Sequence, residues 1–214
     1  MGLLCVSAAR ASAAPPSGLF RVTIAGTAQA TWDHTAAPSD TGDNCKSSLR
    51  SEGMRTVRFR STRPTLVRFV GGRILQVAVR GLAGTVTLSG PNTLNRICSG
   101  VETHVSQPCA NTTRTFTNGH ASLGGSDPGT ISIDSAQVSL RRADCPLEPV
   151  DVVRAPLGPV PGAVKVSLAS LSRPRVARVT LRAMASRHKM YAAPEAGKLT
   201  HQSVWTLTFT RVQP

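Results

Sequence analysis

The sequence predicts an all-β protein, a two-layer antiparallel β-sandwich held together by disulfide bonds. Three observations support this fold class. Both ends of the chain alternate apolar and polar residues, turn signals separate many short alternating segments, and no segment combines a sustained helical period with a capped start. A chain of 214 residues is long enough to bury a substantial core as one domain.

The two terminal strands show the clearest alternation. In the segment 20–32, Phe20, Val22 and Trp32 lie on one face while threonine, arginine and glutamine occupy the other. The segment 204–212 repeats the pattern, with Trp205 on its apolar face. We expect both strands in one sheet system, with Trp32 and Trp205 in the core.

Shorter segments between the two ends have the same character, and we expect eight to eleven strands in all. The predicted internal strands are 55–61, 65–70, 74–79, 85–88, 114–117, 130–134, 136–142, 163–168 and 176–183. Turns are expected at Gly71-Gly72 and at 89–91, and Asn118-Gly119 suits a tight hairpin. The segment 177–190 is also compatible with a helix, and we interpret it as a strand followed by a loop.

The sequence predicts one β domain, residues 19–214, that follows a short leader. Five prolines between residues 146 and 162 mark a crossover between layers, because the 50 residues after it would barely form a core of their own. The leader, residues 1–14, is a remnant of a secretory signal peptide in this interpretation, with an A-x-A pattern at residues 11–13. Its removal would take Cys5 with it and leave a secreted, extracellular or cell-wall-associated protein without a transmembrane segment.

Four cysteines remain after the leader: Cys45, Cys98, Cys109 and Cys145. An even number in an exported chain predicts disulfide bonds rather than free thiols, and no cysteine or histidine spacing fits a zinc site. Sequence leaves three pairings open, of which we expect Cys98 with Cys109 and Cys45 with Cys145.

The chain is strongly basic, with a formal net charge of +14 from 25 basic and 11 acidic residues. Twenty-one of the basic residues are arginine, and no acidic residue lies between Glu52 and Glu102 or between Asp151 and Glu195. Within these tracts, alternation places the arginines of two segments on solvent faces of strands. The predicted anion-binding residues are Arg58, Arg60, Arg178 and Arg182.

An arginine-bearing face would attract an anionic cell-envelope polymer or an extracellular protein partner. We therefore expect a non-enzymatic β domain of this kind. A GC-rich genome alone would also produce many arginines, which leaves a structural domain without a ligand as an alternative. Nucleic acid is disfavoured as a partner because aromatic residues make up only 4% of the chain.

No motif specifies a catalytic residue, a metal site or a cofactor. The chain lacks G-x-S-x-G, S-x-x-K and H-E-x-x-H, and its five histidines stand in no recognisable frame: His34, His104, His120, His188 and His201. A secreted hydrolase of carbohydrate or ester substrates is the second alternative, since two carboxylates can meet from anywhere in a fold. The oxygen-rich loop at Asp33, Asp40, Asp43 and Asn44 reads as a solvated turn rather than a calcium site.

The layout also resembles a group of uncharacterised secreted proteins of high-GC actinobacteria. The resemblance rests on Gly26-Thr-Ala-Gln-Ala-Thr-Trp32, on Asp144-Cys145, and on Trp205-Thr-Leu-Thr-Phe-Thr-Arg-Val212. It implies a secreted β-sandwich and carries no activity to this chain.

Overall fold

The computed structural model describes residues 17–40, 45–106, 109–125, 127–139, 149–166 and 178–212. This part of the chain is almost entirely β, with one short helix. The elements in chain order are β1 (Gly18–Thr35), β2 (Ser39–Asp40), β3 (Cys45–Ser61), β4 (Thr65–Val70), β5 (Arg73–Gly90), β6 (Asn92–Cys98), β7 (Val101–Ser106), β8 (Cys109–Gly125), β9 (Thr130–Gln137), α1 (Val150–Arg154), β10 (Val164–Lys165), β11 (Arg178–Met190) and β12 (Ala196–Arg211).

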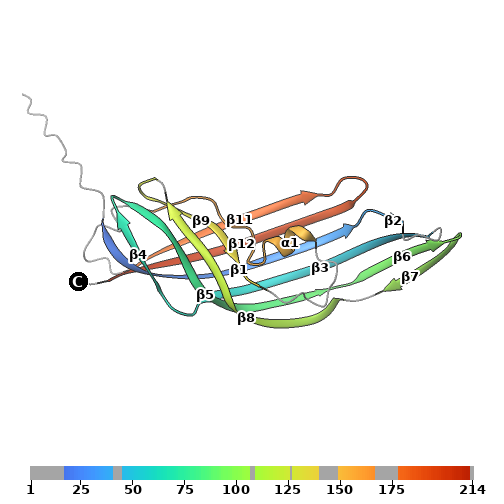
Figure 1. Ribbon diagram of the computed structural model, residues 1–214, viewed down its shortest axis with the longest axis horizontal. Coiled ribbons are helices and arrows are strands. Elements are labelled where there is room, and N and C mark those ends of the chain that lie inside the picture. The colour runs from blue at the N-terminus through green and yellow to red at the C-terminus, as the bar shows by residue number, and fades with distance from the viewer. Residues whose placement is uncertain are drawn as a thin grey trace, which may run out of the picture.

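Backbone pairing joins these strands into one antiparallel sheet of long strands (Figure 1). β1 lies between β3 and β12, and β11 pairs with the other side of β12. On its far side β3 pairs first with β6 and then with β5, so these two strands lie one after the other along it. β8 continues the sheet from β5 to β9 and β10.

The alternation of β1 shows why the sequence folds this way. Its even-numbered residues from Phe20 to Trp32 are buried, apart from the half-buried Gly26, and its odd-numbered residues point to the opposite face. β12 alternates in the same register, burying Trp205, Leu207 and Phe209. Each buried aromatic or branched side chain removes apolar surface from water, so the sheet has one apolar face and one polar face.

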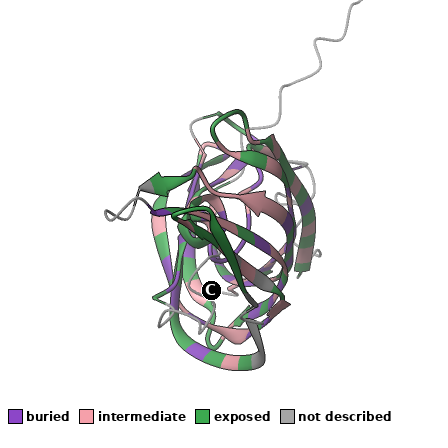
Figure 2. Ribbon diagram, turned by 90° about the vertical axis from the view of Figure 1, so that its right-hand side faces the viewer, coloured by how far each residue is buried: buried purple, intermediate pink, exposed green. Residues whose placement is uncertain are grey.

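Seen end-on, the sheet curls around its apolar face (Figure 2). We call the curled-in, apolar side the inner face and the other side the outer face. α1 and the proline-rich segment after it lie on the inner face, where Val152 and Leu157 are fully buried. The carbonyl oxygen of Pro159 accepts hydrogen bonds from Ser203 Oγ and Trp205 Nε1, which fixes this segment to β12.

One close approach on the inner face requires a glycine. The indole of Trp32 lies against Gly53 on the neighbouring strand β3, and a Cβ atom at residue 53 would overlap the ring. Trp32 Nε1 donates a hydrogen bond of 2.8 Å to Ser51 Oγ, which is buried. Gly53 therefore lets this tryptophan pack flat while its one polar atom remains satisfied.

The predicted all-β class is confirmed, and Trp32 and Trp205 are in the core as expected. The predicted two-layer sandwich is not confirmed, because strand pairing joins the strands into one continuous sheet. The turn at Gly71-Gly72 is also confirmed: it connects β4 to β5.

Four local predictions were wrong. The turn expected at 89–91 does not reverse the chain, because β5 and β6 pair one after the other with β3. Asn118-Gly119 lies within β8, where the register is irregular and Gly119 fits closely over Leu82. The residues after Ala183 continue as β11 to Met190 because the whole segment pairs with β12. No separate strand begins at residue 136, because β9 continues without a break to Gln137. Residues 140–142 of the expected strand lie outside the described part of the chain.

The predicted disulfide pairing was also wrong, because Cys45 is bonded to Cys98. These two residues are direct partners in the β3–β6 register, and their Cα atoms are 4.2 Å apart. The expectation of a polar loop between Cys98 and Cys109 failed because β7 and the start of β8 occupy that segment. Cys145 lies outside the described residues.

Candidate functional site

The outer face of the sheet carries all four arginines predicted to bind anions. Arg58 and Arg60 project from β3, and Arg178 and Arg182 project from β11; all four are exposed. We call these four residues the arginine quartet. They share one face because their neighbours along each strand, such as Phe59 and Ala183, are buried on the inner face.

The strand register places the two halves of the quartet opposite each other. Arg60 pairs with Ala25, Ala25 with Thr206, and Thr206 with Arg182, so these residues form one row across β3, β1, β12 and β11. Three strand spacings separate the backbones of Arg60 and Arg182 by about 14 Å. Along β3, Arg58 and Arg60 are about 7 Å apart.

A fifth arginine extends the basic region toward the end of the sheet. Arg21 lies in the same row as Thr210 and Arg178 and is exposed. Among the described residues, neither Arg21 nor any member of the quartet forms an ion pair or a side-chain hydrogen bond. Five guanidinium groups on one face are therefore available to a ligand.

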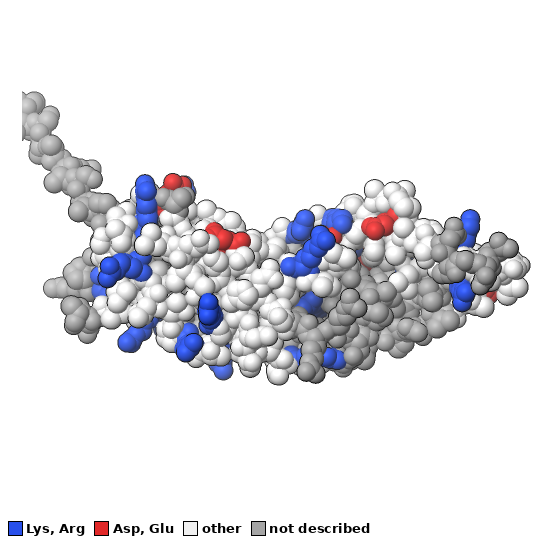
Figure 3. Space-filling view, viewed as in Figure 1, with Lys and Arg blue, Asp and Glu red and all other residues white. Residues whose placement is uncertain are grey.

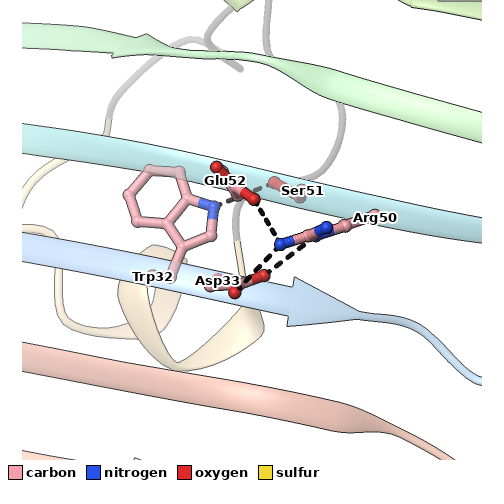
Figure 4. A network of polar contacts seen from close by, with 5 residues as sticks. All are labelled: Trp32, Asp33, Arg50, Ser51 and Glu52. Atoms are coloured by element: carbon pink, nitrogen blue, oxygen red, sulfur yellow. Dashed lines mark hydrogen bonds and ion pairs between the residues drawn. The ribbon is translucent and has the colours of Figure 1, made fainter.

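At the opposite end of the outer face, Arg50 is paired with two carboxylates (Figure 4). Arg50 donates two hydrogen bonds to the carboxylate of Asp33, at 3.2 and 3.3 Å, and forms an ion pair with Glu52. The hydrogen bonds that Arg50 donates to Asp33, helped by the charges of both carboxylates, raise the pKa of Arg50. Paired and unpaired arginines are thus segregated along one face.

A second charged cluster surrounds α1 on the inner side, and sequence reasoning missed it. Asp151 on α1 accepts a hydrogen bond of 2.7 Å from Lys189 Nζ and lies 3.7 Å from Arg187, both on β11. The hydrogen bond from Lys189 is the main cause of the lowered pKa of Asp151, and that of Lys189 is raised in return. Basic side chains gather in the middle of this face, where Figure 1 places α1 (Figure 3).

A buried pair of basic side chains lies next to α1. Arg55 and His201 flank Ala30 in one row of the sheet, and each is at least 96% buried. Arg55 Nη1 donates a 3.5 Å hydrogen bond to the carbonyl oxygen of Val152. Burial, with the charges of Arg55 and Arg187, lowers the pKa of His201 to about 4, so its imidazole is neutral at pH 7.

The structure assembles no hydrolytic centre from the described residues. The carboxylates of Asp33 and Glu52, which are partners in the β1–β3 register, are half-buried and both bound by Arg50. The partners of the histidines are not serines: His104 bonds to Asn95, and His188 lies 3.3 Å from Thr200 Oγ1. The hydrolase alternative gains no support from this geometry.

The same part of the chain offers no metal cluster and no membrane-spanning helix. The described ranges contain no group of three or more histidine, cysteine or acidic residues that would hold a metal ion. Of the predicted oxygen-rich loop, Asp33 is committed to Arg50, and Asp43 and Asn44 lie outside those ranges. No described helix is long and apolar enough to cross a membrane.

The chain was compared with protein-family models, with curated proteins and with solved structures, and none of the three comparisons found a match.

Proposed function

We propose that this protein is a non-enzymatic secreted or cell-wall-associated β domain that binds an anionic polymer through the basic part of its outer face. The observation that carries the proposal is the arrangement of the arginine quartet. Four exposed guanidinium groups, which form no ion pair among the described residues, lie on two strands that are far apart in the chain and about 14 Å apart across the sheet, and they face the same way. A compositional excess of arginine does not by itself require these residues and Arg21 to share neighbouring rows of one face.

Guanidinium chemistry suits this role. Its planar fork matches carboxylate, phosphate and sulfate oxygens, and it keeps its charge at any extracellular pH. Each contact to an exposed arginine is weak by itself. Several such contacts in one patch add up when the ligand carries several anionic groups on one chain. The patch therefore favours an anionic polymer over a small anion.

The Cys45–Cys98 disulfide supports the proposed location, because such bonds persist in oxidising compartments. The aromatic residues help to define the ligand. All five phenylalanines and both tryptophans are buried, and the single tyrosine, Tyr191, packs against the smaller core cluster. The outer face therefore offers no phenylalanine, tyrosine or tryptophan ring on which a nucleic-acid base would stack.

Salt elution from immobilised heparin tests the proposal. Replacing all four quartet arginines by glutamine removes four charges from one face, and we expect elution at clearly lower salt than the native protein. The matched control replaces four exposed basic residues outside the quartet by glutamine: Lys46, at the far end of β3 from Arg58 and Arg60, and Arg73, Arg96 and Lys165.

The control has the same net charge as the quartet variant, so it separates a binding face from general basicity. We expect it to elute close to the native protein. Equal loss of retention in both variants would favour the structural domain without a ligand, since any basic surface would then serve equally well.

A further inference from the structure

We infer that the polymer held by the quartet is a hydroxyl-rich acidic polysaccharide, and that the threonines between the two arginine pairs recognise its hydroxyl groups. This inference rests on the proposed function and deepens it. The arginines supply charge recognition for any polyanion. The residues between them decide which polyanion fits best.

The surface between β3 and β11 is built from β1 and β12. The outer-face residues of these two strands in the rows next to the quartet are short: Thr23, Ala25, Thr27, Val204, Thr206 and Thr208. They are all exposed or half-buried. A linear chain lying along β1 and β12 would therefore rest on threonine hydroxyls and reach long arginine side chains on both sides.

The threonines here also lie close to one another on the outer face. Thr23 and Thr208 are partners in one row, and Thr180 Oγ1 lies 3.5 Å from Thr208 Oγ1. A hydroxyl both donates and accepts a hydrogen bond, which is the same capacity that a sugar hydroxyl has. A polymer that alternates sugar hydroxyls with carboxylate or sulfate groups matches a surface that alternates threonines with arginines.

Isosteric substitution isolates the role of the hydroxyls. Thr206→Val with Thr208→Val removes two hydroxyl groups and keeps shape, charge and β propensity. The control variant carries Thr31→Val and Thr200→Val, which are partners in one outer-face row of β1 and β12. That row meets β3 at Met54, about 14 Å along the strand from Arg58. Binding is measured by titration with two probes: a heparin-derived dodecasaccharide, and linear polyphosphate, which carries charge without sugar hydroxyls.

For the Thr206/Thr208 variant we expect about tenfold weaker binding of the dodecasaccharide, from the loss of two hydrogen bonds, and unchanged binding of polyphosphate. The control variant should bind both probes as the native protein does. Serine at 206 and 208 should restore the affinity, which separates the loss of hydroxyls from damage to the fold.

Two results would overturn the inference. One is unchanged dodecasaccharide binding by the valine variant, and the other is an equal loss for both probes. In either case the proposed function still holds if the quartet variant binds both probes more weakly than the native protein. The proposed function fails together with the inference if the quartet variant binds both probes like the native protein. Tighter binding of a single-stranded DNA oligonucleotide than of the dodecasaccharide would also contradict the inference.

Discussion

His201 is the residue whose environment differs most from that of an ordinary surface side chain. It is buried on β12 beside the guanidinium of Arg55, and burial lowers its pKa to about 4. In the unfolded chain the same imidazole takes up a proton near pH 6.5. Between pH 6.5 and 4 the unfolded state therefore binds more protons, and the stability of the fold decreases as the pH falls through this range.

Replacing His201 with glutamine should remove this dependence. A pKa difference of this size corresponds to at most about 3 kcal/mol of unfolding free energy lost between pH 6.5 and 4. Urea denaturation at several pH values measures it, with His188→Gln, a change at an exposed histidine on β11, as control. The account predicts a smaller decline only in the His201 variant, and the same decline in all three proteins would contradict it.

Gly53 is the second residue that carries a specific stability prediction. Because a Cβ at this position would overlap the indole of Trp32, Gly53→Ala should destabilise the fold by about 1–3 kcal/mol. Gly162→Ala is the control, since a Cβ there meets no atom within 4 Å. Thermal unfolding of both variants measures the difference, and equal melting temperatures would show that Trp32 does not depend on Gly53.

Among the elements, the β3–β6 pair depends most on a covalent bond. Cys45 and Cys98 are 53 residues apart in sequence, and closing a loop of that length stabilises a fold by about 4 kcal/mol in the chain-entropy model. We expect Cys45→Ala with Cys98→Ala to lower the denaturation midpoint accordingly. Mass spectrometry of a non-reduced digest should find the Cys45–Cys98 peptide pair, and a Cys98–Cys109 or Cys45–Cys145 pair in its place would contradict the register of β3 and β6.

The strands that sequence predicted well are those with one strongly apolar face. β1 and β12 alternate over most of their lengths because the inner face buries Val22, Ile24, Leu207 and Phe209. The first half of β3 and the whole of β6 and β7 were not predicted. Their side chains, such as Lys46 and Arg96, are largely exposed, so backbone pairing and the disulfide define these strands without a periodic apolar signal.

The two charged sites also differed in how well the sequence predicted them. The outward direction of Arg58, Arg60, Arg178 and Arg182 follows from local alternation, which sequence shows directly. The cluster of Asp151, Arg187 and Lys189 joins a short helix to a strand through a long connection, and no local pattern records such a contact. The burial of Arg55 could have been predicted from the sequence. Arg55 lies two residues before Val57 on β3, and alternation therefore places both side chains on the inner face.

On the scale of the whole molecule, the sheet separates two kinds of surface. One side buries the aromatic residues under the curl of the sheet and the segment around α1, and the other side is largely exposed to solvent (Figure 2). Long antiparallel strands keep the outer face regular, so residues far apart in sequence hold fixed spacings across it. The proposed function depends on that regularity, since one binding site for a polymer would need four arginines from two strands to hold fixed positions.

The most direct measurement of this claim is the salt dependence of binding to a heparin-derived dodecasaccharide in solution. Because each arginine that neutralises an anionic group releases counterions, the slope of log affinity against log salt should fall by up to about four for the quartet variant. The equally charged variant at Lys46, Arg73, Arg96 and Lys165 should keep the native slope. Equal slopes in the quartet variant and the native protein would contradict the account, because the quartet would then make no contact with the polymer.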